Sequence, residues 1–161
     1  MRNEQTLEKL KAMRLSGMAD LYEQQTSDES IQSLGFEERF ELLVDAESAR
    51  RKSNKLDRLI QQATFSDSNA SIEGIEYYPD RHLDKNLISK LAQGGYIDNH
   101  QNIILMGASG NGKTWIANAF GIQACRQFRK VKYIRLPELI DEFGYCIQIE
   151  PLRRRLEPLN A

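Results

Sequence analysis

Apolar residues recur at helical spacing through the first part of the chain. In residues 1–24 they lie three or four positions apart and predict one helix, in which Gly17 is a weak point. A polar stretch over residues 26–30 interrupts the pattern. The pattern resumes at Phe36 and continues to Ala63, so we expect a single long helix of about seven turns there.

Beyond this long helix the pattern becomes mixed. Residues 66–71 are small and polar and indicate a linker. Two short apolar runs, at 103–106 and 131–136, predict strands, and a helix candidate over 114–129 separates them. A short helix with proline at its start is expected over 137–143. The order strand, helix, strand, helix predicts an α/β fold for this part of the chain.

A glycine-rich motif lies between the first predicted strand and its helix. Residues 107–114 read GASGNGKT and match the pattern G-x-x-x-x-G-K-[ST] at every defined position. Such a loop holds phosphates against backbone N–H groups at a helix N-terminus, where side chains in place of the glycines would block the approach. We expect Lys113 to reach the β and γ phosphates and the Thr114 hydroxyl to hold the accompanying Mg²⁺. The predicted cofactors are ATP and Mg²⁺, and the predicted nucleotide-binding residues are Gly107, Ala108, Ser109, Gly110, Asn111, Gly112, Lys113 and Thr114.

Charge is balanced over the whole chain but not along it. Lys and Arg number 22 and Asp and Glu number 23, which gives a net charge of −1 and no global basic field. The predicted long helix nevertheless carries a cationic run, and its DNA-contact candidates are Arg50, Arg51, Lys55 and Arg58. A solvated helix face is the alternative interpretation of this run. No apolar run or signal peptide indicates a membrane, so we expect a cytoplasmic protein.

Several segments besides the loop match one protein family. They are Met13–Ala19, Leu34–Arg39, Gly95–Ile97 and Tyr133–Leu139. Together with the loop they resemble the IstB-type ATP-binding helpers of insertion-sequence transposases, a branch of the AAA+ ATPases close to the DnaC-type helicase loaders. The resemblance covers roughly residues 5–143.

The resemblance implies a fold, a domain organisation and partners. The implied fold is α/β: a helical N-terminal domain followed by the start of a three-layer P-loop (AAA+) α/β domain that is incomplete at the C-terminus. The expected domains are 1–67, which contacts DNA or transposase, 68–100, a linker and lead-in, and 101–161, a partial P-loop NTPase domain. The implied partners are DNA, a cognate transposase and further copies of the chain assembled on DNA.

The resemblance also implies a Walker B acid pair, a sensor residue and an arginine finger, which the chain lacks before Ala161. The local candidate for the acid pair is Leu139–Glu142, but its apolar spacing suits an amphipathic helix better than a strand. In AAA+ sheets the Walker B strand lies between the two strands predicted here. We therefore expect a truncated member with impaired hydrolysis, and ATPase activity itself stays open.

Three functions remain open at this point. The first is an ATP-binding helper of transposition, favoured by the residues at 13–19 and 36–39. A DnaC-type helicase loader in DNA replication is the second. The third is a non-enzymatic module that docks to DNA or to a transposase.

Overall fold

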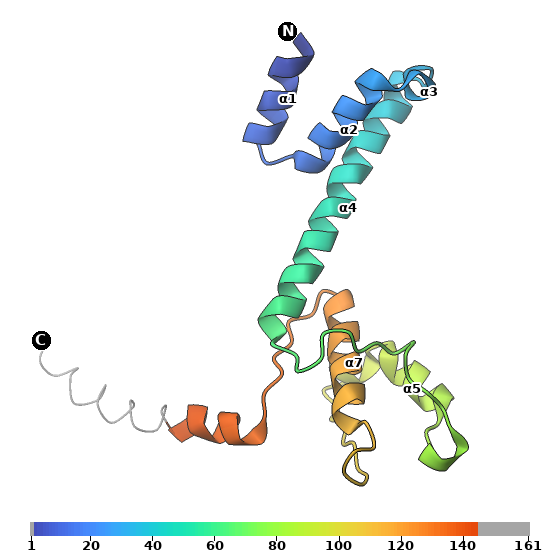
Figure 1. Cartoon of the computed structure of the whole chain (residues 1–161), viewed down its shortest axis with the longest axis vertical. Coiled ribbons are helices and arrows are strands. Elements are labelled where there is room, and N and C mark those ends of the chain that lie inside the picture. The colour runs from blue at the N-terminus through green and yellow to red at the C-terminus, as the bar shows by residue number, and fades with distance from the viewer. Residues whose placement is uncertain (1, 145–161) are drawn as a thin grey trace, which may run out of the picture. The chain divides into compact units, whose positions relative to one another are not determined.

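A computed structural model of the chain describes residues 2–144 (Figure 1). The chain divides into two compact units, Met1–Arg58 and Leu59–Ala161. The helix α4, Phe36–Ala63, supplies residues to both. None of the helices among the described residues is long and apolar enough to cross a membrane.

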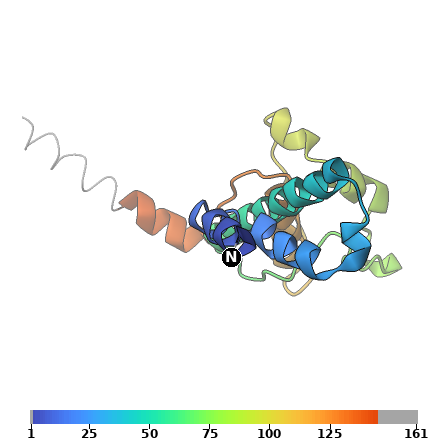
Figure 2. The same cartoon turned by 90° about the horizontal axis from the view of Figure 1, so that it is seen from above.

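The N-terminal unit is entirely helical. It contains α1 (Arg2–Ala12), α2 (Ser16–Ser27), α3 (Glu29–Gln32) and the larger part of α4. Figure 1 and Figure 2 both show α2 running beside α4. The close contact occurs at Gly17, where a Cβ atom would lie 2.9 Å from the carbonyl oxygen of Ala46. The absence of a side chain at Gly17 therefore permits the two helix backbones to meet.

The sequence predicts the long helix correctly but not the first one. The predicted bounds of the long helix, Phe36 and Ala63, are those of α4. The prediction of one helix over residues 1–24 is wrong, because α1 ends at Ala12 and α2 begins at Ser16. Arg14 has a φ of 59°, a left-handed conformation that ends a helix. The break thus lies upstream of Gly17, which is itself within α2.

The C-terminal unit is built around α7, Lys113–Arg126. It also contains the end of α4, the 3-10 helix η1 (Pro79–Arg81), α5 (Lys85–Ala92), α6 (Gly95–Asp98) and helical residues at 136–144. Side chains from successive turns of α7 are buried and pack against the segment before α5 and against α5 itself. This core contains Ile75, Ile88, Ile116 and Phe120, and a second cluster contains Ala70, Ala119 and Ile122.

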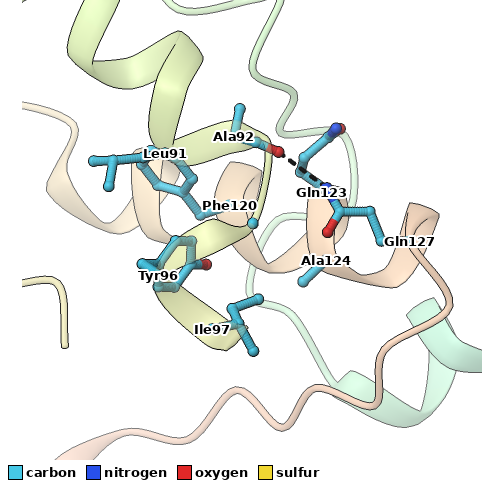
Figure 3. A pocket seen from close by; sticks show the side chains of 9 residues that line it. Leu91, Ala92, Tyr96, Ile97, Phe120, Gln123, Ala124 and Gln127 are labelled. Atoms are coloured by element: carbon cyan, nitrogen blue, oxygen red, sulfur yellow. Dashed lines mark hydrogen bonds between the residues drawn. The ribbon is translucent and has the colours of Figure 1, made fainter. Parts of the chain in front are cut away.

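The helices α5 and α6 are held against the C-terminal half of α7 (Figure 3). Gln127 Nε2 donates a hydrogen bond of 3.1 Å to the carbonyl oxygen of Ala92, at the end of α5. The rings of Tyr96 and Phe120 pack edge to face with centroids 6.5 Å apart. These contacts anchor the lead-in segment on the same helix whose N-terminus follows the glycine-rich loop.

The expected α/β fold is contradicted, since residues 2–144 contain no strand. The segment 103–106 keeps a strand-like alternation, with Ile104 79% and Met106 88% exposed and the other two residues half-buried. Within the described part of the chain, however, neither this segment nor 131–136 forms a strand ladder. In the second segment the Tyr133 N–H instead donates 2.8 Å to the carbonyl oxygen of Ala63. The prediction of strands at 103–106 and 131–136 is therefore wrong, because a strand requires a hydrogen-bonded neighbour and neither segment has one among the described residues.

The short helix predicted over 137–143 is confirmed, because residues 136–144 are helical. The acids Asp141 and Glu142 therefore lie on a helix and not at the end of a strand. Lys132 Nζ bonds both carboxylate oxygens of Glu142 at 2.7 Å. The expectations for residues 145–161 lie outside the described residues.

Candidate functional site

The predicted phosphate loop joins an extended segment to the N-terminus of α7. Gly110 has a φ of 83° and Gly112 a φ of 74°, both in the left-handed region that side chains disfavour. Gly112 is the N-cap of α7 and makes no side-chain capping hydrogen bond. The N–H groups of the first turn therefore have neither intrahelical acceptors nor a capping side chain, and they form an anion-binding helix end.

Lys113 is folded back onto the loop that precedes it. Its Nζ atom lies 2.8 Å from the carbonyl oxygen of Gly107 and 2.6 Å from that of Ala108. Among the residues that the structure describes, no carboxylate forms an ion pair with Lys113. Within this part of the chain the Lys113 ammonium contacts main-chain carbonyls and no carboxylate, so it is available for a phosphate group.

Thr114 is exposed and lines a hollow of about 570 Å³ that borders the loop. Ser66, Asp67 and Asn118 line the same hollow. Asn118 is fully buried; its Nδ2 donates 2.8 Å to Ser66 Oγ, and its Oδ1 has no hydrogen-bond partner among the described residues. The sequence indicated only a linker at 66–71, so the placement of these polar groups beside the loop was missed.

The donor set around Thr114 fits a magnesium ion that arrives with a nucleotide. The Thr114 hydroxyl and the Asp67 carboxylate are among the groups that line the hollow. Residues 2–144 contain no group of three or more His, Cys, Asp or Glu side chains that could hold a metal alone. Magnesium commonly takes one or two protein oxygens and completes its shell with phosphate oxygens and water, which agrees with this arrangement.

A second hollow, of about 640 Å³, also borders the loop. Its lining includes residues of the segment 76–83 together with Met106, Gly107 and Lys113. Arg81, in this segment, contacts the loop directly: its Nη2 lies 3.3 Å from the carbonyl oxygen of Asn111. No sequence motif points to Arg81, because Arg81 and Asn111 are 30 positions apart in the chain.

The candidates for DNA contact lie on α4, and two of them are already paired with acids. Arg50 forms an ion pair with Asp20. Arg51 Nε lies 2.7 Å from Glu47 Oε1, and this guanidinium lowers the pKa of Glu47 below its ordinary value. Lys55 and Arg58 are both exposed. Acidic side chains therefore neutralise part of the positive charge of this run.

The chain is similar to ATP-binding proteins of insertion sequences. The family model described as IstB-like ATP binding protein matches residues 8–156. A putative ATP-binding protein of insertion sequence IS1162 from Pseudomonas fluorescens is 41% identical over 142 residues, which cover 88% of this chain and 62% of the relative.

Two relatives from Sinorhizobium fredii extend the comparison. The putative insertion sequence ATP-binding protein y4pL is 38% identical over 134 residues, covering 83% of this chain and 54% of that protein. The putative insertion sequence ATP-binding protein y4uH is 31% identical over 156 residues, covering 97% of this chain and 62% of that protein. The chain thus spans less than two thirds of the length of these relatives.

Proposed function

Because the chain belongs to the family of IstB-like ATP-binding proteins, we propose that it is the ATP-binding helper of an insertion-sequence transposase. The residues that bind the nucleotide in this proposal are Gly107–Thr114. The observation that carries it is the position of Lys113, whose ammonium group is held by loop carbonyls at the uncapped N-terminus of α7.

The geometry supports binding of a polyphosphate, in which contacts of Lys113 with main-chain carbonyls are exchanged for contacts with phosphate. The N–H groups at the start of α7 bind phosphate oxygens, and Lys113 leaves the carbonyls of Gly107 and Ala108 for the β and γ phosphates. The Thr114 hydroxyl would hold a magnesium ion that accompanies the nucleotide, and the ion would supply neutralisation of phosphate charge.

The proposed partners are DNA and the cognate transposase. On the DNA side the support comes from α4, where Lys55 and Arg58 are exposed and could contact phosphates without reading sequence. The relatives are named as proteins of insertion sequences, which supports a transposase as the protein partner.

A docking role for the N-terminal unit is the second candidate, and one observation favours it. Phe36 and Phe40, at the start of α4, are 73% and 50% exposed and stack with ring centroids 6.0 Å apart. Exposed aromatic pairs are typical of protein interfaces. Replacing both by serine is expected to weaken transposase binding and to leave nucleotide binding unchanged.

The experiment that tests the main proposal measures Mg-ATP binding by the whole chain. Trp115, next to the loop in α7, is the chain's sole tryptophan, so its fluorescence reports on the site. Saturable binding that Lys113→Ala abolishes, together with a melting temperature raised by Mg-ATP, is the expected result. If wild type and Lys113→Ala respond alike to Mg-ATP, the proposal is wrong.

A further inference from the structure

Arg81 connects the lead-in segment to the end of the phosphate loop. It is the last residue of η1, and its Nη1 donates 2.7 Å to the carbonyl oxygen of Glu76. Its Nη2 donates 3.3 Å to the carbonyl oxygen of Asn111. One guanidinium group therefore bridges two main-chain carbonyls, those of Glu76 and Asn111, and both residues line the same hollow.

This contact depends on the glycine that begins α7. A Cβ atom at Gly112 would lie 3.1 Å from Arg81 Nη2, closer than most such contacts, so glycine gives the guanidinium room to reach the loop. The same residue adopts the left-handed φ of 74° that turns the chain into the helix. Gly112 therefore has two roles: it leaves room for the Arg81 guanidinium, and it turns the chain into α7.

The loop is held at both ends by cations. Lys113 bonds the carbonyls at its start, Gly107 and Ala108, and Arg81 bonds the carbonyl near its end. Among the described residues neither cation forms an ion pair with a carboxylate. When Lys113 moves to a phosphate, as the proposed function requires, Arg81 is the cation left to hold the loop.

We propose that Arg81 is a positioning residue of the nucleotide site. This role rests on the proposed function. Arg81 fixes the Asn111–Gly112 peptide, so that the N–H groups that follow it are ordered before the phosphates bind. Ordering a loop in advance raises affinity because binding no longer bears the entropy cost of fixing it. The contact suits arginine in particular, since its planar fork reaches two acceptors from fixed positions whereas a lysine ammonium is a single point charge.

The test measures Mg-ATP affinity of the whole chain through Trp115 fluorescence. The variants are Arg81→Ala, Arg81→Lys and, as a matched control, Arg126→Ala, which removes an arginine of the same unit that pairs with Glu73. We expect Arg81→Ala and Arg81→Lys to weaken binding on the order of tenfold, and Arg126→Ala to leave it unchanged. Millimolar guanidinium chloride is expected to restore affinity to Arg81→Ala and to have no effect on wild type.

The outcomes separate this inference from the function on which it rests. No saturable binding by wild type would overturn both. Binding by wild type with equal affinity in Arg81→Ala would overturn the inference alone, and so would full affinity in Arg81→Lys, because charge without the fork would then suffice. A loss in Arg81→Ala that guanidinium does not restore, accompanied by a lower melting temperature without ligand, would also overturn it, since the residue would then only stabilise the fold.

Discussion

Gly17 lies directly against Glu47 where α2 meets α4. The N–H of Gly17 donates 2.9 Å to Glu47 Oε2, and a Cβ atom at Gly17 would lie 2.9 Å from the Cα atom of Glu47. Glu47 is only 8% exposed, and Arg51 binds its other carboxylate oxygen. One glycine and one carboxylate thus join the two helices through main-chain contact and a buried charge.

Gly17→Ala is expected to destabilise the N-terminal unit by about 2 kcal/mol, because the added methyl group would meet backbone atoms that cannot move independently. Urea unfolding followed by far-UV circular dichroism measures the change. Gly35→Ala is the matched control, since the nearest atom to a Cβ there is the end of the Glu38 side chain at 3.9 Å. Equal urea midpoints for the two variants would show that the close contact is not a constraint.

The carboxylate of Glu47 predicts how stability changes with pH. Hydrogen bonds from Arg51, and then from the N–H groups of Gly17 and Met18, hold the pKa of Glu47 below its ordinary value of 4.5, while burial opposes them. A carboxyl group whose pKa is lower in the folded state stabilises the fold above its unfolded pKa. This contribution begins to be lost as the pH falls below about 4.5, and it is gone once the pH lies below the lower pKa of the folded state.

Glu47→Gln is therefore expected to have a lower free energy of unfolding than wild type at pH 7. The difference in free energy between the two proteins is expected to narrow as the pH falls below 4.5. Urea midpoints measured at intervals from pH 7 to pH 3 would check this expectation. A difference in urea midpoint that stays constant from pH 7 to pH 3 would mean that the charge of Glu47 does not contribute to the stability of the fold.

The parts of the structure that the sequence predicted are those whose signal is local. The bounds of α4 follow from a long periodic pattern, and the glycine-rich loop and the helix after it follow from a motif of adjacent residues. The strand predicted at 103–106 failed because a strand depends on a distant partner, although the alternation in exposure at Ile104 and Met106 is real. The contact of Arg81 with Asn111 was not predictable either, since it depends on how segments 30 residues apart come together.

Arg58→Gln is expected to weaken DNA binding more than Arg50→Gln. Arg58 is exposed on α4, whereas Arg50 already pairs with Asp20 and would have to give up that contact to bind a phosphate. Fluorescence anisotropy of a labelled duplex over a range of salt concentrations measures the effect. Loss of one phosphate contact reduces the slope of log affinity against log salt by about 1 for Arg58→Gln. A larger change in slope for Arg50→Gln than for Arg58→Gln would contradict this assignment.

Thr114→Val is expected to remove the advantage that Mg²⁺ gives to ATP binding. Valine keeps the shape of threonine but has no hydroxyl oxygen for the ion, whereas the N–H groups of α7 and the ammonium of Lys113 remain in place. Wild type should bind ATP more weakly in EDTA than with Mg²⁺, on the order of tenfold, and the variant should bind equally under both conditions. Ser109→Ala is the control, because its hydroxyl lines the same hollow but is not the one assigned to the ion. If Thr114→Val keeps the full Mg²⁺ effect, the ion is held by other groups, and Asp67, which lines the same hollow, becomes the first to test.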